Sequence, residues 1–244
     1  MVEMIVISFT ALLLLFGIIQ FALLYNAKTV LNYATFEAAR IGALNYAHPD
    51  AMRLALAQKL AVLEPVTPLE KLSFVPTMVW DKTKDYQQLV AQQEGFLEEF
   101  DSIACIKRVS PTDNSGHWQS AIKAPGGVDS IPNDHLLHRD RDLDSEGLSI
   151  QDANLLKISV SYCPKMIVPI VSSVVKNLML LDRYNELPVS GSFMENQLEG
   201  YLPPDSLTEF QTSCYENNRF PMVAQALIRM QTPVGKYSFS DCGS

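Results

Sequence analysis

The residues best suited to chemistry lie in a polar segment from about residue 111 to residue 152. Its acidic run DHLLHRDRDLDSEG places three aspartates at alternate positions, Asp140, Asp142 and Asp144. Oxygen ligands recur with this spacing at the start of an EF-hand calcium loop. The EF-hand pattern then fails, because Ser145 stands where the loop needs glycine and Gln151 stands where it needs a bidentate glutamate. We therefore predict a solvated loop, with calcium binding as the weaker alternative.

Other reactive arrangements have less support from the sequence. His135 and His138 lie beside Asp134 and Asp140 and could form a metal site. A histidine pair three residues apart in a charged loop is more often part of a solvated surface. The chain has no nucleophile elbow, P-loop or dinucleotide fingerprint. A Ser/His/Asp triad converges only in space, so the sequence leaves it open, and we predict a protein that is not an enzyme and needs no cofactor.

Four cysteines follow the apolar amino terminus, at Cys105, Cys163, Cys214 and Cys242. An even number in an exported domain predicts two disulfides, for which three pairings are possible. We favour Cys105 with Cys163 and Cys214 with Cys242, since each pair then joins neighbouring elements or fixes the terminal tail. The spacing of cysteines and histidines is not that of a zinc or thiol redox site.

The amino terminus predicts a membrane-spanning helix. Residues 4–25 are uncharged and mostly apolar, and about 22 such residues form a helix of about 33 Å, enough to cross the hydrocarbon core of a bilayer. The run is too long for the apolar core of a cleaved secretory signal, and no basic residue precedes it. Glu3 is costly at the mouth of this segment unless another charge compensates it. We expect a basic leader upstream of Met1.

The helix is expected to continue beyond the membrane. Residues 26–44 contain no proline and consist mainly of helix formers. Ala34, Ala38 and Gly42 lie four residues apart and form a stripe of small residues, a surface that lets another element approach closely. Two alternatives stay open: the stripe packs on the chain's own domain, or it packs on the helix of another subunit.

The first 44 residues combine a Val-Glu-apolar start, a Leu-rich span broken by Gly-Ile-Ile, and the ending Glu-Ala-Ala-Arg-Ile-Gly-Ala. This combination resembles the amino-terminal module of TadE-like minor pilins of the Tad (tight adherence) pilus machinery. Two later segments are similar to longer members of that family. They are ANLLKISVSY at residues 153–162 and FPMVAQALIRMQTPV at residues 220–234.

The resemblance implies a type IV pilin-like precursor that a prepilin peptidase cleaves after a glycine. In such proteins a glutamate at the fifth mature position pairs with the terminal amine of a neighbouring subunit, because opposite charges at membrane depth are less costly together. Glu3 matches this glutamate but stands at position three, so we expect that two mature residues are missing or that the start differs. The implied partners are membrane lipid, other minor pilins, the major pilin and the inner-membrane assembly platform.

Residues 1–48 are thus expected to form a hydrophobic assembly helix, and residues 49–244 an exported α+β domain with disulfides. The domain carries the whole net charge of −8, which makes it a poor ligand for nucleic acid and anionic lipid. We predict a helix capped by Asp50, with Leu54, Leu56 and Leu60 on its apolar face. A second helix is predicted at residues 85–100, with Phe100 among its buried residues.

Strand patterns follow in the second half of the chain. Residues 103–109 are a short candidate, and residues 155–162 alternate cleanly, with one face formed by Leu156, Ile158, Val160 and Tyr162. Residues 220–231 have the same period and are the natural antiparallel partner. Between these strands, Pro164 is placed to begin a helix that Pro169 would kink. Its ten uncharged residues, 166–175, are too few to span a bilayer, and we expect them to pack on the sheet rather than on the membrane surface.

The predicted function is that of a non-enzymatic minor pilin in the assembly or tip of a Tad or type IV-like pilus, with a contribution to adhesion. Glu3 would set the register of assembly, and the small-residue stripe would contact a neighbouring helix. The carboxyl-terminal domain would lie in the periplasm and then in an extracellular pilus. The alternative is a membrane-anchored periplasmic binding protein or hydrolase that enters no filament.

Overall fold

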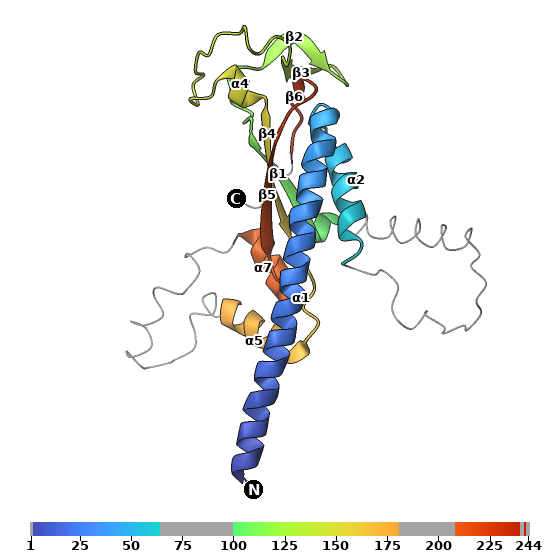
Figure 1. Ribbon diagram of the computed structural model, residues 1–244, viewed down its shortest axis with the longest axis vertical. Helices are drawn as coiled ribbons and strands as arrows, with labels where there is room; N and C mark the ends of the chain where they lie inside the picture. The colour runs from blue at the N-terminus through green and yellow to red at the C-terminus, as the bar shows by residue number, and fades with distance from the viewer. Residues whose placement is uncertain (1, 64–99, 181–207, 240–241, 243–244) are drawn as a thin grey trace, which may run out of the picture. The chain divides into compact units, whose positions relative to one another are not determined.

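The computed structural model describes residues 2–63, 100–180, 208–239 and 242 (Figure 1). The elements are, in chain order, α1 (Val2–Leu44), α2 (Pro49–Leu60), β1 (Ala104–Ser110), β2 (Gln119–Ala124), β3 (Val128–Ile131), α4 (Ile150–Ala153), β4 (Leu155–Tyr162), α5 (Pro169–Leu180), α7 (Glu209–Glu216), β5 (Met222–Arg229) and β6 (Val234–Gly235). A long apolar helix is thus followed by antiparallel sheets and helices, which confirms the predicted α+β class.

The chain divides into two compact units. Unit 1 contains Met1–Tyr25, Cys163–Pro221 and Gly243–Ser244, and unit 2 contains Asn26–Tyr162 and Met222–Cys242. The division along α1 therefore falls between Tyr25 and Asn26, so the first part of this helix belongs to unit 1 and the remainder to unit 2.

α1 runs unbroken from Val2 to Leu44, as the absence of proline predicts. Two residues in the left-handed conformation follow its end, Tyr46 with φ 57° and Ala47 with φ 58°. The N–H of Ala47 donates to the carbonyl of Gly42 over 2.8 Å, which satisfies a carbonyl that the helix end would otherwise leave unpaired. This tight ending reverses the chain into α2.

α2 begins two residues earlier than expected, at Pro49. His48 is its N-cap and makes no side-chain cap hydrogen bond, and Pro49 follows in the first turn, where a missing N–H is tolerated. The prediction that Asp50 caps this helix is therefore wrong, since Asp50 lies inside the first turn. Leu54 was expected on the buried face but is exposed. The buried residues of α2 are Met52, Leu56, Ala57 and Leu60.

The first sheet has the strand order β1-β4-β5 and is antiparallel throughout. β4 is its central strand, and β5 pairs with it along its full length, from Leu155 opposite Arg229 to Tyr162 opposite Met222. Every second side chain of β4 has an exposed fraction of 0 %, at Leu156, Ile158, Val160 and Tyr162. The predicted alternation and the predicted antiparallel partner are both confirmed. β1 corresponds to the candidate strand at residues 103–109, displaced by one residue.

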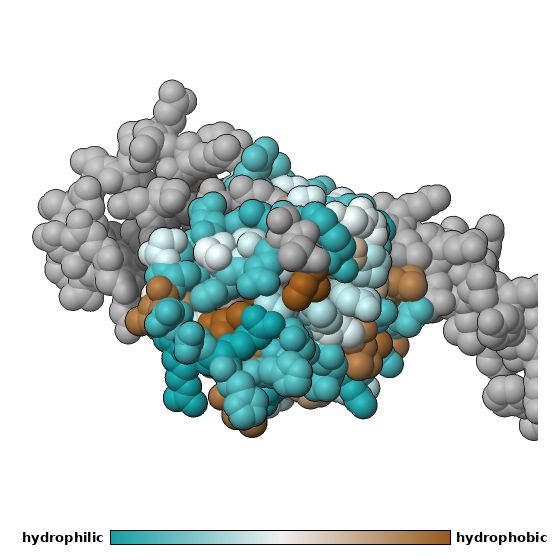
Figure 2. Space-filling model, turned by 90° about the horizontal axis from the view of Figure 1, so that it is seen from above, coloured by the Kyte–Doolittle hydropathy of each residue, from teal (hydrophilic) through white to brown (hydrophobic). Residues whose placement is uncertain are grey.

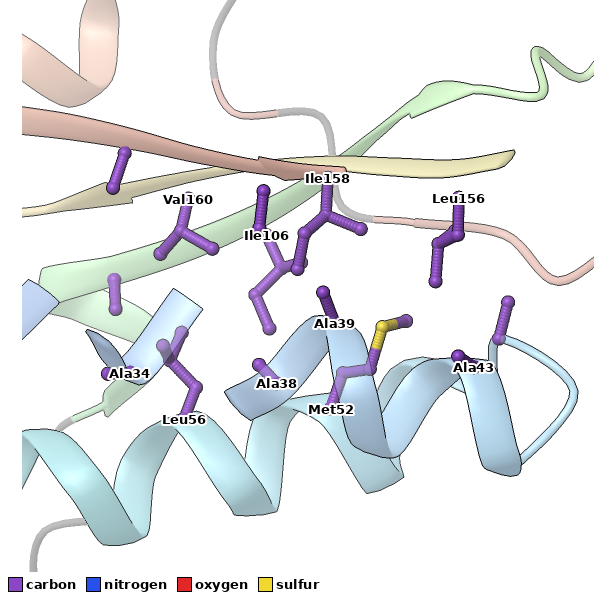
Figure 3. Packing of buried hydrophobic residues seen from close by; sticks show 14 of the residues in the cluster. Ala34, Ala38, Ala39, Ala43, Met52, Leu56, Ile106, Leu156, Ile158 and Val160 are labelled. Atoms are coloured by element: carbon purple, nitrogen blue, oxygen red, sulfur yellow. The ribbon is translucent and has the colours of Figure 1, made fainter. Parts of the chain in front are cut away.

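One face of this sheet is covered by α2 and by the part of α1 that belongs to unit 2 (Figure 3). Small side chains on α1 allow the helix to lie close to the strands. The core residues labelled there are Ala34, Ala38, Ala39, Ala43, Met52, Leu56, Ile106, Leu156, Ile158 and Val160.

A second antiparallel sheet has the order β2-β3-β6. The hairpin between β2 and β3 turns at Gly126 and Gly127, whose φ values of 83° and 75° are readily adopted by glycine. This sheet includes part of the polar segment at residues 111–152, where a solvated loop was expected and no hairpin was predicted. The strands have only six, four and two residues, which gives little alternation from which to recognise them.

Arg108 connects the two sheets within unit 2. Its buried guanidinium donates to the carbonyl of Gly235 in β6 over 3.0 Å and forms an ion pair with Asp113. It also lies 5.1 Å from the ring centroid of Trp118 and 5.0 Å from that of Phe239. Burial lowers the pKa of Arg108, and Asp113 opposes that shift. Hydrogen bonds and stacking thus compensate a buried charge.

The disulfides differ from the favoured pairing. They join Cys105 to Cys242 and Cys163 to Cys214, with Cα–Cα distances of 5.7 and 5.9 Å. The prediction of Cys105 with Cys163 and Cys214 with Cys242 is wrong because strand register decides which cysteines are neighbours. Cys105 lies opposite Ser161 in the β1–β4 pair, and the chain leaves the sheet after Tyr162, before it reaches Cys163.

The segment after β4 also differs from expectation. α5 begins at Pro169, so this proline opens the helix instead of kinking it. Ile167, Ile170 and Val174 are 67 %, 47 % and 57 % exposed, so the prediction that the segment buries its apolar residues on the sheet is wrong for these three. The other predicted helix lies largely outside the described residues, but residues 100–103 are helical and Phe100 is buried as predicted.

Candidate functional site

The exposed apolar side chains of α1 are concentrated in its first part. They include Ile7, Leu12, Leu13, Leu14, Leu15, Ile18, Ile19, Phe21 and Leu23. In the described part of the chain, α1 is the one helix that is long and apolar enough to cross a membrane, and 11 % of its most apolar window is buried. A core helix of a soluble protein would bury most of that window. The segment therefore has the length and surface of a membrane anchor.

Glu3 lies in the first turn of α1. The predicted partner of Glu3 is the amine of another subunit, so its role in assembly stays a prediction.

The small-residue stripe is built into the core of unit 2. Ala34 and Ala38 have an exposed fraction of 0 %, and Gly42 is buried. A Cβ atom at Gly42 would lie 2.4 Å from the sulfur of Met52 and 3.1 Å from Cδ2 of Leu156. Of the two alternatives left open, the stripe thus packs on the chain's own domain. Its assignment as an assembly surface is corrected, because α2 and β4 already occupy the space beside it.

Gln20 is a positioning residue that the sequence analysis missed. It lies within the predicted span, its exposed fraction is 2 %, and its Oε1 accepts a hydrogen bond from the N–H of Val168 over 3.0 Å. The carbonyl of Val168 accepts in turn from the N–H of Ser172 over 2.9 Å, which makes Val168 the N-cap of α5. The signal in the sequence was a lone amide in an apolar run, since a polar side chain at membrane depth needs a partner.

Asp144 holds together two parts of the polar segment, at residues 115–116 and 146–148. Its carboxylate accepts hydrogen bonds from the hydroxyl of Ser115 over 2.6 Å and from the N–H groups of Gly116, Glu146 and Leu148 over 3.1, 2.9 and 3.0 Å. The Ser115 hydroxyl and these backbone donors hold the pKa of Asp144 well below its usual range. The side chain is 3 % exposed. Asp144 therefore serves as an acceptor that fixes the loop.

The structure gives the calcium candidates no shared ligand set. Asp140 and Asp142 are exposed, whereas Asp144 is turned to its four donors. Within the described ranges, no group of three or more His, Cys, Asp or Glu side chains could hold a metal ion. His135 and His138 are exposed residues of one turn, in which the N–H of His138 donates to the carbonyl of His135 over 2.9 Å. The loop is ordered by hydrogen bonds.

Two loops bring together a serine, a histidine and an aspartate, with Ser115 and His117 before β2 and Asp144 after β3. The hydroxyl of Ser115 donates directly to Asp144, and Nε2 of His117 lies 2.8 Å from the carbonyl of Leu148. A carbonyl only accepts, so Nε2 carries the proton and is no base toward the hydroxyl. In a catalytic triad the serine contacts the histidine and the histidine contacts the carboxylate. Here the hydroxyl binds the carboxylate directly, Nε2 of His117 lies 3.9 Å from Oδ2 of Asp144, and Ser115 is buried, so the order of contacts is not that of a triad.

A pocket in unit 2 lies where α2 and β1 begin. Its lining includes Arg53, Phe100, Asp101, Cys105 and Phe239. Arg53 donates to both carboxylate oxygens of Asp101 over 2.7 and 2.8 Å, so the opposite charges at this pocket pair with each other. The view of the molecule in Figure 2 is mostly hydrophilic, with hydrophobic residues scattered over it. Neither this pocket nor the surface seen in Figure 2 indicates a particular ligand.

Comparison with known proteins finds a family match at the amino terminus. Residues 1–40 match the family described as TadE-like protein. The chain carries a TadE-like module. The match includes Glu3, Gln20 and the first two residues of the small-residue stripe, and α1 extends four residues beyond it to Leu44. No curated protein and no solved structure matches the chain.

The TadE-like module ends inside the core of unit 2. Ala34, Ala38 and Ala39 are among its last residues and are fully buried beneath the first sheet. The module is therefore both the candidate anchor and part of the folded domain, because one helix serves both.

Proposed function

We propose that the protein is a non-enzymatic minor pilin that takes part in the assembly or tip formation of a Tad or type IV-like pilus. The observation that carries the proposal is the TadE-like module within one continuous helix, apolar and exposed in its first part and built into a folded domain in its second. Such a helix can hold the domain at the periplasmic face of the inner membrane before assembly. Its exposed side chains suit first lipid and then neighbouring helices.

In this proposal, the negative charge of Glu3 sets the register between neighbouring subunits during assembly. In an apolar surrounding its carboxylate is costly alone and is stabilised by the amine of a neighbouring subunit. The partners in this proposal are the major pilin, other minor pilins and the inner-membrane assembly platform, with prepilin peptidase as the processing enzyme. The exported domain would contact partner pilins and contribute to adhesion.

A Glu3→Gln variant, expressed in the native host, tests this role. The variant leaves the neighbour's amine without its counter-charge, and breaking a buried pair costs about 3–5 kcal/mol. We expect the amount of protein in sheared filaments to fall by at least about 100-fold, since each 1.4 kcal/mol is about tenfold. The amount in membranes and the disulfide state are expected to stay unchanged.

The matched control is Glu37→Gln in the same helix. Glu37 lies beyond the predicted span and is 4.0 Å from Arg40, a weak surface pair. This variant is expected to enter filaments normally. Normal incorporation of the Glu3 variant would contradict the registration role. Mass spectrometry of the amino-terminal peptide in both fractions separates a processed filament subunit from an anchored protein that enters no filament.

A further inference from the structure

α5 exposes two apolar side chains on a face that also carries the exposed Ser173 and Asn177. Ile170 and Val174 are one helical turn apart and are 47 % and 57 % exposed, whereas Ser172 is 6 % exposed. Ile167, just before the helix, is 67 % exposed. A surface helix in water usually buries its apolar residues, whereas Ile170 and Val174 are exposed here beside polar side chains. A face that mixes exposed apolar and polar side chains fits the boundary between lipid and water.

Within unit 1, a hydrogen bond to Gln20 of α1 holds the first residues of α5 beside that position of α1. Gln20 accepts the N–H of Val168, the N-cap of α5, and Figure 1 shows α5 beside the first part of α1. Gln20 precedes Tyr25, the end of the predicted span, by five residues, or about 7.5 Å along the helix axis. Interfacial helices bury their apolar face about 5–10 Å into the boundary between headgroups and acyl chains. The level set by Gln20 matches that depth.

The charge of the segment also fits a lipid surface. From Cys163 to Leu180 the chain has two lysines, Lys165 and Lys176, and no acidic residue. The whole chain has a net charge of −8, so this basic stretch stands apart from an acidic protein. Lys165 is exposed, and the amine of Lys176 donates to the carbonyl of Glu216 over 2.7 Å. A segment without acidic residues is not repelled by anionic headgroups. The overall charge alone had predicted no such contact.

We propose that α5 is an interfacial helix, with Ile167, Ile170 and Val174 in contact with the acyl chains at the bilayer surface. Gln20 holds it at that depth by binding the N–H of Val168. The proposal rests on the membrane anchoring that is part of the proposed function. It gives the protein a second membrane contact. This contact would fix the orientation of unit 1 relative to the bilayer as well as its position.

The test uses tryptophan as a depth probe in the full chain, reconstituted in vesicles of phosphatidylcholine and phosphatidylglycerol. A Val174→Trp variant places an indole on the exposed face, and the signal of unsubstituted protein is subtracted. Lipids brominated near the headgroup end of the acyl chains are expected to quench it at least about twofold more than lipids brominated at the chain ends. The matched control is Leu137→Trp in the polar loop, where Leu137 is 90 % exposed.

The outcomes separate this proposal from the proposed function. Retention in vesicles after carbonate washing, with V174W quenched and L137W not quenched, supports the interfacial helix. Retention with both variants equally unquenched overturns it and leaves the membrane anchor intact. Loss of the protein from the washed vesicles overturns both. A V174W signal that is shielded only in assembled filaments would assign this face to a neighbouring subunit and would also overturn the proposal.

Discussion

At the scale of single residues, polar side chains that look reactive in the sequence are acceptors and donors for the fold. Asp144 stood out as a calcium candidate, yet its carboxylate is taken up by Ser115 and by three backbone N–H groups. Gln20 attracted no attention in the sequence, yet it binds the N-cap of α5. Residue type and spacing predict which groups need partners, but the partner is known only when distant segments meet.

Asp144→Asn is expected to destabilise unit 2 near neutral pH by about 2–3 kcal/mol, because the amide loses a charge that accepts several hydrogen bonds. The pKa of Asp144 is lower in the folded than in the unfolded protein. Its stabilising contribution is therefore complete above the unfolded pKa of about 3.9 and is lost as the pH falls below that value. Urea unfolding at several pH values should show this loss in the unsubstituted protein and little of it in the variant.

Asp142→Asn is the matched control, since Asp142 lies in the same loop and is exposed. We expect it to leave the free energy of unfolding within about 0.5 kcal/mol of the unsubstituted protein. Equal effects of both variants would contradict the role given to Asp144. A calcium-dependent rise in melting temperature that Asp142→Asn removes would restore the calcium alternative.

At the scale of elements, α1 changes its surface along its length. Large apolar side chains are exposed in the predicted span, and small side chains are buried beneath the sheet in unit 2. The small residues let α2 and β4 approach closely, and Gly42 is the tightest of these contacts. A stripe of small residues indicates close packing in either case, so its partner had to come from the tertiary structure.

Gly42→Ala is expected to lower the stability of unit 2. The added methyl group would meet the sulfur of Met52 at 2.4 Å, and overpacking of this kind costs about 1–3 kcal/mol. The higher helix propensity of alanine offsets about 1 kcal/mol of that cost. A net loss of about 0–2 kcal/mol is expected by urea unfolding, and a larger loss with Gly42→Leu.

Gly17→Ala is the control in the same helix, because a Cβ atom at Gly17 would meet nothing within 4 Å. It is expected to leave the unfolding of unit 2 unchanged. If Gly42→Leu were tolerated as well as Gly17→Ala, Gly42 would not be packed against Met52 and Leu156 as described.

At the scale of the whole molecule, each unit has its own disulfide. Cys105–Cys242 lies in unit 2 and closes a separation of 137 residues, and Cys163–Cys214 lies in unit 1 and closes 51 residues. A crosslink stabilises mainly by restricting the unfolded chain, so each bond is expected to act on the unit that contains it. Each disulfide thus joins two cysteines of the same unit.

Removing Cys163–Cys214 with a double Cys→Ser variant is expected to destabilise unit 1 by about 2–4 kcal/mol. Limited proteolysis should then cut faster at residues 163–180 and 208–221, while the first sheet stays protected. The matched variant without Cys105–Cys242 is expected to expose unit 2 instead. Peptide mapping without reduction checks the pairing directly, and a peptide linking Cys105 to Cys163 would contradict it.

The sequence by itself determined the features that depend on local pattern. The apolar run with its Val-Glu start indicated the TadE-like module, the absence of proline predicted the continuous helix, and alternation predicted β4 and its antiparallel partner β5. These patterns are readable because helix and strand periods place neighbours along the chain on one face. Only the tertiary structure decided the disulfide pairing, the partner of the small-residue stripe, the contact of Gln20 and the role of Asp144. Each of these depends on strand register or on contacts between distant segments, which local sequence does not encode.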